Sequence, residues 1–249
     1  MGNLILCEIM KLKRSKIVYI SFLGVMAAPV MMLVEAIQVH IKHPEQTVTL
    51  VDFYSNSLLY TMLLMNLMVF VIIAANLFSR EYTEKTLKTI LPVPISKSKL
   101  ITSKFCILFL WIIVLTVFTW ISALLLATIY HAAFGMHDFS SAIAFIWLGK
   151  LLLSGILLFI TISPFAFIAE KTKGLFVPMI TAAVIVMLNA ALSNQEMGAL
   201  YPWTATFFIV EERLASTGYP IWLSVGLIAL VSIIGFVATF RYFQKEDIK

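Results

Sequence analysis

Six long runs without a charged side chain divide this chain of 249 residues, and they constrain its fold more than any other feature. Each run can supply the roughly 20 apolar residues with which a helix crosses about 30 Å of hydrocarbon. Lipid offers no partner to a peptide group, and the runs lack the alternating polarity of barrel strands, so we expect helices. The predicted spans cover residues 17–39, 55–79, 103–130, 146–169, 174–193 and 220–243.

The composition points to the same class. Hydrophobic residues make up 61% of the chain and charged residues 12%, about half the charged fraction of a soluble domain. Lipid must therefore cover much of the surface. The sequence predicts an all-α polytopic membrane protein, with one transmembrane domain over residues 1–249 and the bilayer as a partner. Cys7 and Cys106 show neither a disulfide framework nor a metal-ligand spacing.

The distribution of basic residues predicts the orientation. With six spans, all of the 18 lysines and arginines except Lys42, Lys150 and Arg213 fall on one side. The positive-inside rule then places both termini in the cytoplasm, in the cell membrane. Because the basic residues punctuate apolar spans, the net charge of +5 does not indicate a nucleic-acid partner. The start resembles a signal peptide, but its apolar run continues past Ala27-Ala28 and is interpreted as the first span.

The residues before the first span form an amphipathic leader. Ile5, Ile9 and Leu12 share one helical stripe, with Lys13 and Lys16 beside it. Such a helix is expected to lie flat at the inner membrane surface, with its lysines near anionic headgroups. An ordinary positive-inside anchor would show the same residues.

The loop after the second span has a helical pattern. Glu81–Lys85 and Glu84–Lys88 are opposite charges four residues apart with the acid first, which favours a short helix. Its apolar stripe consists of Leu87, Ile90 and Leu91. Pro92 and Pro94 then end it. A partly apolar helix in the cytoplasm suits a groove on another protein, although a solvated loop with helical propensity would also show this pattern.

The segment Glu81-Tyr-x-x-Lys-Thr-Leu-x-x-Ile-Leu-Pro-Val-Pro-Ile-Ser-Lys-x-x-Leu-x-x-x-Lys104 resembles the first cytoplasmic loop of permeases of type-2 ATP-binding-cassette exporters. It is most similar to the small branch with bacitracin and lantibiotic self-protection permeases. In that family an acidic residue precedes a Thr-Leu pair, and a proline with a Ser-Lys element leads into the third helix. The likeness covers the whole chain in architecture but only residues 80–104 in motif. Lys85 departs from it, because many relatives have glycine there.

The resemblance implies that residues 80–95 hold a coupling helix, which docks in a cleft of a separate ATPase subunit. The implied coupling residues are Glu81, Tyr82, Glu84, Lys85, Thr86, Leu87, Ile90 and Leu91. ATP and Mg²⁺ would bind to that subunit, since this chain has no Gly-x-x-x-x-Gly-Lys-Ser/Thr loop. The chain is thus expected to be a transport subunit without enzyme activity or a bound cofactor. It would pair with a second copy or with a related permease.

Several polar residues fall at membrane depth. Glu35 lies near the outer end of the first span and Lys150 near the outer end of the fourth, so they are candidates for an ion pair. Alternatively, Lys150 marks the interface and snorkels to water. Asn66 and Asn189 are expected to form hydrogen bonds between helices.

The outer segment of residues 201–219 is predicted to contain a short amphipathic helix closed by Gly218. Its candidate gate residues are Phe207, Glu211 and Glu212. In the family, a comparable outer helix helps to seal the translocation path. The other interpretation is an aromatic belt, with Trp203 and Tyr219 anchored at the headgroups.

The resemblance implies an exporter of amphipathic antimicrobial or toxin peptides, for resistance, immunity or secretion. The alternatives are a permease for another substrate, such as sodium or lipid, and a channel or secondary transporter without an ATPase. A channel or a secondary transporter would need buried carboxylates or paired broken helices, which the sequence does not show. The trio Glu211-Glu212-Arg213 lies outside the membrane with histidines only in loops, so an intramembrane protease is rejected. No metal site is predicted, because the outer histidines share no ligand spacing.

Overall fold

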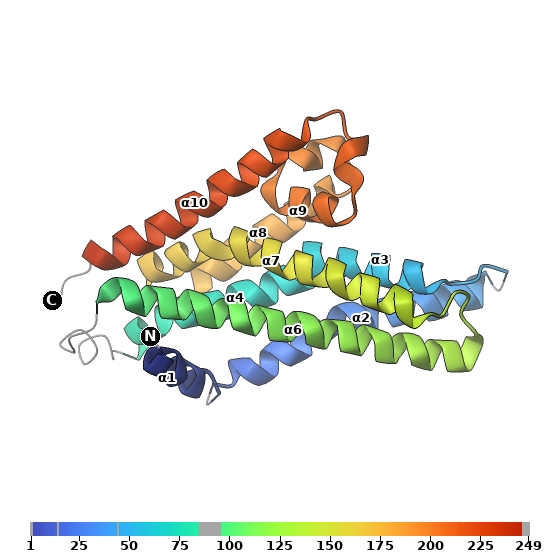
Figure 1. The fold of residues 1–249 in the computed structure, drawn as a ribbon, viewed down its shortest axis with the longest axis horizontal. Coiled ribbons are helices and arrows are strands. Elements are labelled where there is room, and N and C mark those ends of the chain that lie inside the picture. The colour runs from blue at the N-terminus through green and yellow to red at the C-terminus, as the bar shows by residue number, and fades with distance from the viewer. Residues whose placement is uncertain (1, 14, 44, 85–95, 246–249) are drawn as a thin grey trace.

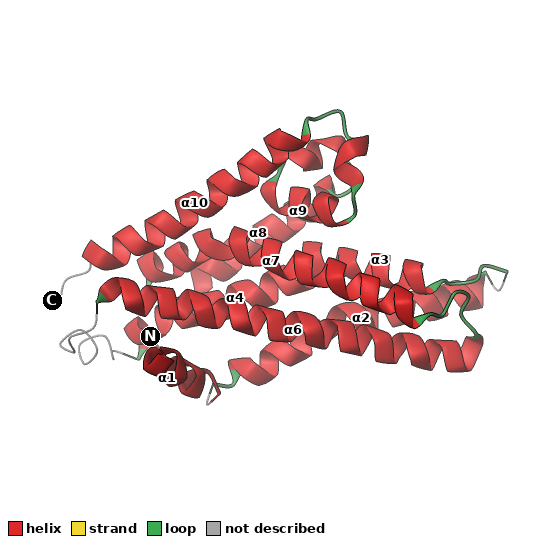
Figure 2. Cartoon of the chain, in the orientation of Figure 1, coloured by secondary structure: helices red, strands yellow, loops and turns green. Residues whose placement is uncertain are grey.

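The computed structural model describes residues 2–13, 15–43, 45–84 and 96–245, and within these ranges the chain is helical with short connections (Figure 2). The elements are α1 Gly2–Lys13, α2 Ile17–Lys42, α3 Leu50–Tyr60, a π-helical turn Thr61–Met65, α4 Asn66–Thr83, α6 Lys97–Phe134, α7 Ser141–Thr172, α8 Phe176–Leu192, a 3₁₀ turn Glu196–Leu200, α9 Pro202–Val210, a 3₁₀ turn Arg213–Ser216 and α10 Ile221–Lys245. The prediction of an all-α membrane protein is confirmed.

Five helical stretches of the described residues are long and apolar enough to cross a membrane. They are α2, the continuous stretch Leu50–Thr83, α6, α7 and α10. The predicted fifth span corresponds to α8, a shorter apolar helix of 17 residues. Six crossings therefore remain a prediction, with α8 as the element that decides it.

The helices run further than the uncharged stretches that revealed them. α6 has 38 residues, which at about 1.5 Å per residue gives about 57 Å, well over the thickness of the hydrocarbon. In Figure 1 both termini lie at the left, the end at which α6 begins and α10 finishes. The connections from α2 to α3 and from α6 to α7 lie at the opposite end. The first four long helices, α2, Leu50–Thr83, α6 and α7, thus alternate in direction, and α10 runs the same way as α7.

The stretch Leu50–Thr83 forms the centre of the bundle. It begins with a capping box, in which the amide of Asp52 donates to Thr49 Oγ1 at 3.1 Å and the amide of Thr49 donates to Asp52 Oδ2 at 3.3 Å. α4 then packs against α7, α8 and α2. Its Phe70, Ala74 and Phe78 are completely buried, as expected for a helix surrounded by others.

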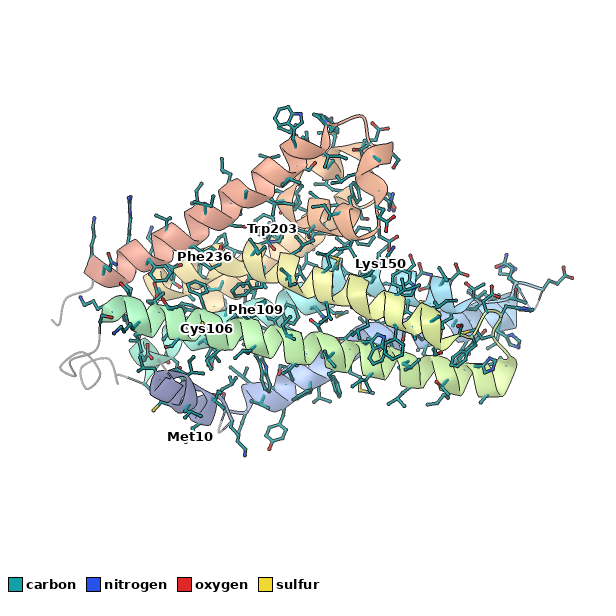
Figure 3. The ribbon with its side chains drawn as sticks, in the orientation of Figure 1. Met10, Cys106, Phe109, Lys150, Trp203 and Phe236 are labelled. Carbon is teal, nitrogen blue, oxygen red and sulfur yellow. The ribbon has the colours of Figure 1, made fainter. Side chains whose placement is uncertain are left out.

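α7 and α10 cross closely. Ser163 Oγ donates to the carbonyl oxygen of Ser232 at 3.0 Å, and a Cβ atom on Gly235 would overlap Ser163. Small residues let the two backbones approach, which is how helices associate in lipid. Phenylalanines line the neighbouring space, with the rings of Phe105 on α6 and Phe236 on α10 4.8 Å apart. Phe109 of α6 and Phe236 of α10 are labelled in Figure 3.

Candidate coupling site and outer gate

The predicted coupling loop is described at its two ends. Glu81, Tyr82 and Glu84 lie at the end of α4, and Lys97 opens α6. The other predicted coupling residues, Lys85, Thr86, Leu87, Ile90 and Leu91, lie outside the described residues. The part of the site that can be described therefore consists of the end of α4 and the start of α6, the two helices that flank the loop.

A buried ion pair joins these two helices. Lys104 Nζ on α6 pairs with Glu81 Oε2 on α4, and both side chains are almost completely buried. The same ammonium donates to the carbonyl oxygen of Leu77 at 2.6 Å and lies 5.6 Å from the ring centre of Phe78. A buried charge needs partners of this kind. The pair joins the helix that leads into the loop to the helix that follows it.

Glu81 was predicted to contact an ATPase directly, and the structure places it differently. Its carboxylate faces inward to Lys104 and Lys11, and the residue is only 3% exposed. A side chain so placed cannot reach the surface of another subunit. Glu81 is therefore an internal connection between helices, because the turn of α4 that carries it packs against α6 and α1 rather than projecting from the bundle.

The leader helix α1 joins the same cluster. Lys11 Nζ lies 2.6 Å from Glu8 Oε1 and 3.7 Å from Glu81 Oε1, while Arg80 Nη1 donates to the carbonyl oxygen of Lys11 at 2.9 Å. Partial burial favours neutral Lys11, but the hydrogen bond and charge of Glu8, with the charge of Glu81, raise its pKa above the ordinary value. We call Glu8, Lys11, Arg80, Glu81 and Lys104 the coupling cluster.

Two predicted coupling residues remain at the described end of the loop. Glu84 has a side chain that is 50% exposed and pairs with Arg80 Nε at 2.8 Å. Tyr82 is partly buried, with Lys173 Nζ 5.1 Å from its ring centre. Glu84 thus offers a surface charge, whereas Tyr82 connects α4 to the turn after α7. Sequence reasoning missed Glu8 and Lys11 as members of the cluster, since Lys11 alone links the local pair to Arg80 and Glu81 of a distant segment.

The intramembrane polar candidates have other partners than expected. Tyr60 donates to Glu35 Oε2 at 2.7 Å, and Lys150 Nζ lies 3.4 Å from Glu212 Oε1 and 5.1 Å from the ring centre of Trp147. The proposed ion pair between Glu35 and Lys150 is therefore wrong. Lys150 is 29% exposed by side chain and points from α7 toward the segment after α9 (Figure 3). This placement fits the interfacial interpretation.

Asn189 connects three elements, as its predicted role of interhelical hydrogen bonding requires. Its Nδ2 donates to the carbonyl oxygen of Leu63 in the π-helical turn at 3.3 Å, and its Oδ1 accepts from Thr204 Oγ1 on α9 at 3.1 Å. A π-helical turn disturbs the regular ladder, and polar side chains often satisfy the freed backbone groups. Asn66 is also buried, but its Oδ1 has no hydrogen-bond partner among the described residues.

The outer segment differs from the predicted amphipathic helix. α9 ends at Val210, a 3₁₀ turn follows, and most of α9 is buried between α7 and α10. Phe207 is 2% exposed, so it belongs to the core. Glu211 accepts from Ser55 Oγ on α3 at 3.2 Å, and Glu212, in the left-handed region with φ 59°, reaches Lys150. Glu211 and Glu212 thus tie the segment to α3 and α7.

Together, a bundle of helices long and apolar enough to cross a membrane and a buried ion pair between the two helices that flank the loop fit a membrane permease. Residues 4–189 match the family model described as ABC-2 family transporter protein, and the chain belongs to this family. It is similar to the bacitracin transport permease protein BCRB of Bacillus licheniformis, with 32% identity over 207 residues that cover 83% of this chain and 97% of that protein. The protein is therefore a multi-pass cell-membrane permease subunit that works with an ABC ATPase.

Proposed function

We propose that this chain is the permease of an exporter for amphipathic antimicrobial peptides, of the kind that bacitracin represents. The observation that carries the proposal is its similarity to a bacitracin transport permease along almost the full length of that relative. Removal of such peptides from the membrane would protect the cell that makes or meets them. Two copies of the chain, or one copy and a related permease, would enclose the path.

The coupling cluster supports a route for the mechanical step. In this proposal the ATPase docks against residues 84–95, and the half-exposed Glu84 forms part of that surface. Movement of the loop then acts on α4 and α6 together, because Glu81 and Lys104 join them. Lys11 and Arg80 extend the connection to α1. A push at the loop would thus tilt several helices rather than unwind one.

Copurification in mild detergent tests the partnership. The native chain, expressed with its candidate ATPase, should retain that ATPase in a fixed ratio. Glu84→Lys reverses a charge on the proposed docking surface and should release it. Glu45→Lys makes the same change at an exposed position of the opposite end and should not. Recovery of the native permease without an ATPase would contradict the proposal and favour a channel.

The cargo needs a separate experiment. ATP hydrolysis by the permease and ATPase reconstituted in vesicles should rise when bacitracin or a lantibiotic is added. Sodium ions and excess lipid serve as the competing candidates. Stimulation by sodium or lipid without any response to the peptides would reject the peptide-export proposal while leaving the ATPase partnership intact.

A further inference from the structure

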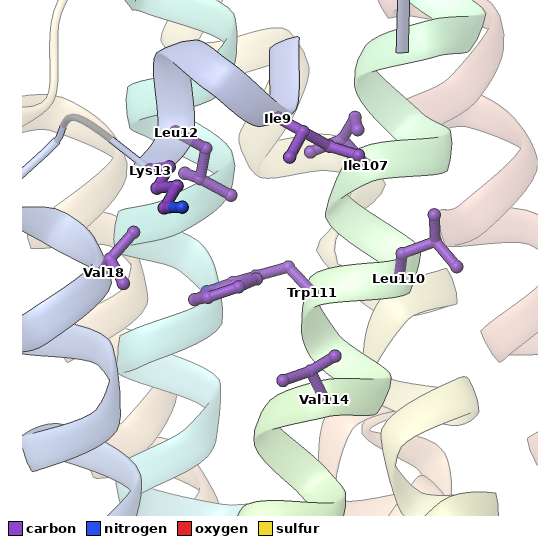
Figure 4. Close-up of a pocket in the computed structure, with 8 residues that line it drawn as sticks. All are labelled: Ile9, Leu12, Lys13, Val18, Ile107, Leu110, Trp111 and Val114. Carbon is purple, nitrogen blue, oxygen red and sulfur yellow. The ribbon is translucent and has the colours of Figure 1, made fainter. Parts of the chain in front are cut away.

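An apolar pocket of about 280 Å³ lies between α1, the start of α2 and the first half of α6 (Figure 4). Ile9 and Leu12 of α1 form one wall, and Ile107, Trp111 and Val114 of α6 form the other. The apolar face of α1 therefore does not pack completely against α2 and α6. The volume is close to the lower limit of about 300 Å³ for ligand pockets, and it suits a stretch of hydrocarbon chain.

Among the described residues that line the pocket, Lys13 alone is charged. Its side chain points from α1 toward the indole of Trp111 (Figure 4). Lys16 follows three residues later and is also exposed, and neither lysine takes part in an ion pair within the described part of the chain. Glu8, the nearest acid along α1, is buried against Lys11. An anion at the mouth would thus meet the ammonium of Lys13, which no acid neutralises within the described part of the chain.

The open side of the pocket faces lipid. Leu110 and Val114 are 51% and 46% exposed, and further along the same helix Ile121 and Leu125 are exposed as well. Lys13 lies just before the first predicted span, residues 17–39, and Trp111 lies eight residues inside the third, so the pocket runs from the boundary between headgroups and hydrocarbon into the hydrocarbon. With both termini in the cytoplasm, this boundary belongs to the leaflet that carries anionic lipid in most cells.

We propose that the pocket binds an anionic phospholipid of the cytoplasmic leaflet, with one acyl chain between α1 and α6 and the phosphate at Lys13. The bound lipid braces α1 at the end that Lys11 and Arg80 connect to Glu81. Lipid composition would therefore affect the coupling cluster. The inference does not depend on the cargo.

Native mass spectrometry of the purified full chain tests the site. Phosphatidylglycerol and phosphatidylcholine with the same acyl chains are titrated, and the first bound lipid is counted. The native chain should prefer phosphatidylglycerol about fivefold, the effect of one lysine beside an anionic lipid. Lys13→Gln should abolish the preference. Lys245→Gln, which removes an exposed lysine at the end of α10, should keep it.

Fluorescence quenching by brominated lipids places the site. In a background whose other tryptophans are phenylalanine, Trp111 should be quenched more by brominated phosphatidylglycerol than by brominated phosphatidylcholine. Trp222, which is 73% exposed on α10, should respond equally to both when it is the remaining tryptophan. Equal quenching of Trp111 by the two lipids, or equal loss of preference in Lys13→Gln and Lys245→Gln, would overturn the proposal.

Discussion

Lys104 carries a charge on a side chain that is 1% exposed, and its partner Glu81 is buried as well. Removal of the lysine alone by Lys104→Met would leave a buried carboxylate without its closest counter-charge. We expect the free energy of unfolding to fall by about 3–5 kcal/mol, the usual cost of breaking a buried ion pair from one side. Unfolding of the purified chain in mixed detergent micelles measures this change.

Two further variants separate charge from packing in that experiment. Lys99→Met removes an exposed lysine five residues earlier on α6 and should change the stability little. The double variant Glu81→Leu with Lys104→Leu leaves no buried charge and should recover part of the loss. If Lys104→Met lost no more stability than Lys99→Met, the ion pair would not hold α4 and α6 together.

Single residues also show how far the sequence could be interpreted. The loop motif contains both Glu81 and Lys104, yet only the folded chain shows that they face each other across 23 residues. The sequence marks Lys150 as a charge at membrane depth, but its pairing with Glu212 depends on the path of the chain after α9. Periodicity indicates which face of a helix is apolar; it does not indicate which distant acid lies opposite a given lysine.

Among the helices, the crossing of α7 and α10 offers the clearest test. Gly235→Val places a side chain against Ser163 and the backbone of Pro164, so α10 must move away. We expect a loss of about 1–3 kcal/mol, as for other overpacked sites. Gly226→Val on the same helix meets open space and serves as the matched control. Thermal unfolding in detergent compares them, and equal melting temperatures would show that the close crossing is not needed.

The junction of the π-helical turn with α8 and α9 rests on one amide. Asn189→Leu would leave the Leu63 carbonyl and the Thr204 hydroxyl without this partner in a dry interior. An expected loss of about 1–3 kcal/mol follows from two orphaned polar groups. Asn194→Leu, at an exposed position just beyond α8, is the control for the same chemical change. Unfolding curves that coincide for the two variants would contradict this assignment.

The positions of the elements could be predicted better than their lengths and surroundings. The uncharged runs locate the part of each helix that lies in the hydrocarbon. The helices themselves continue beyond these runs to their capping residues. α7 begins after Ser140, whose hydroxyl accepts from the amide of Ala142, and α6 stops at Gly135 with φ 75°. The outer helix α9 has apolar residues on most sides because α7 and α10 enclose it, and a single sequence gives no sign of that enclosure.

The topology of the whole molecule depends on α8. Its 17 residues span about 26 Å, slightly less than the hydrocarbon but within the range of known spans. If α8 crosses, the termini share one side and the basic residues are sorted as the positive-inside rule requires. If it does not, the chain has an odd number of crossings, and Arg241 and Lys245 lie outside with the end of α10.

Cysteine labelling from outside the cell decides between these topologies. In a chain without Cys7 and Cys106, a cysteine in place of Asn194, just after α8, should react with a membrane-impermeant reagent, as should one in place of Glu45. A cysteine in place of Lys245 should react only after the membrane is opened. Because the end of α4 and the start of α6, which flank the coupling loop, lie at the same end of the bundle as the C-terminal end of α10, exposure of position 245 to the outside would remove the loop from the reach of a cytoplasmic ATPase. The lysine sorting along the chain and the direction of each helix in the bundle both favour the protected result.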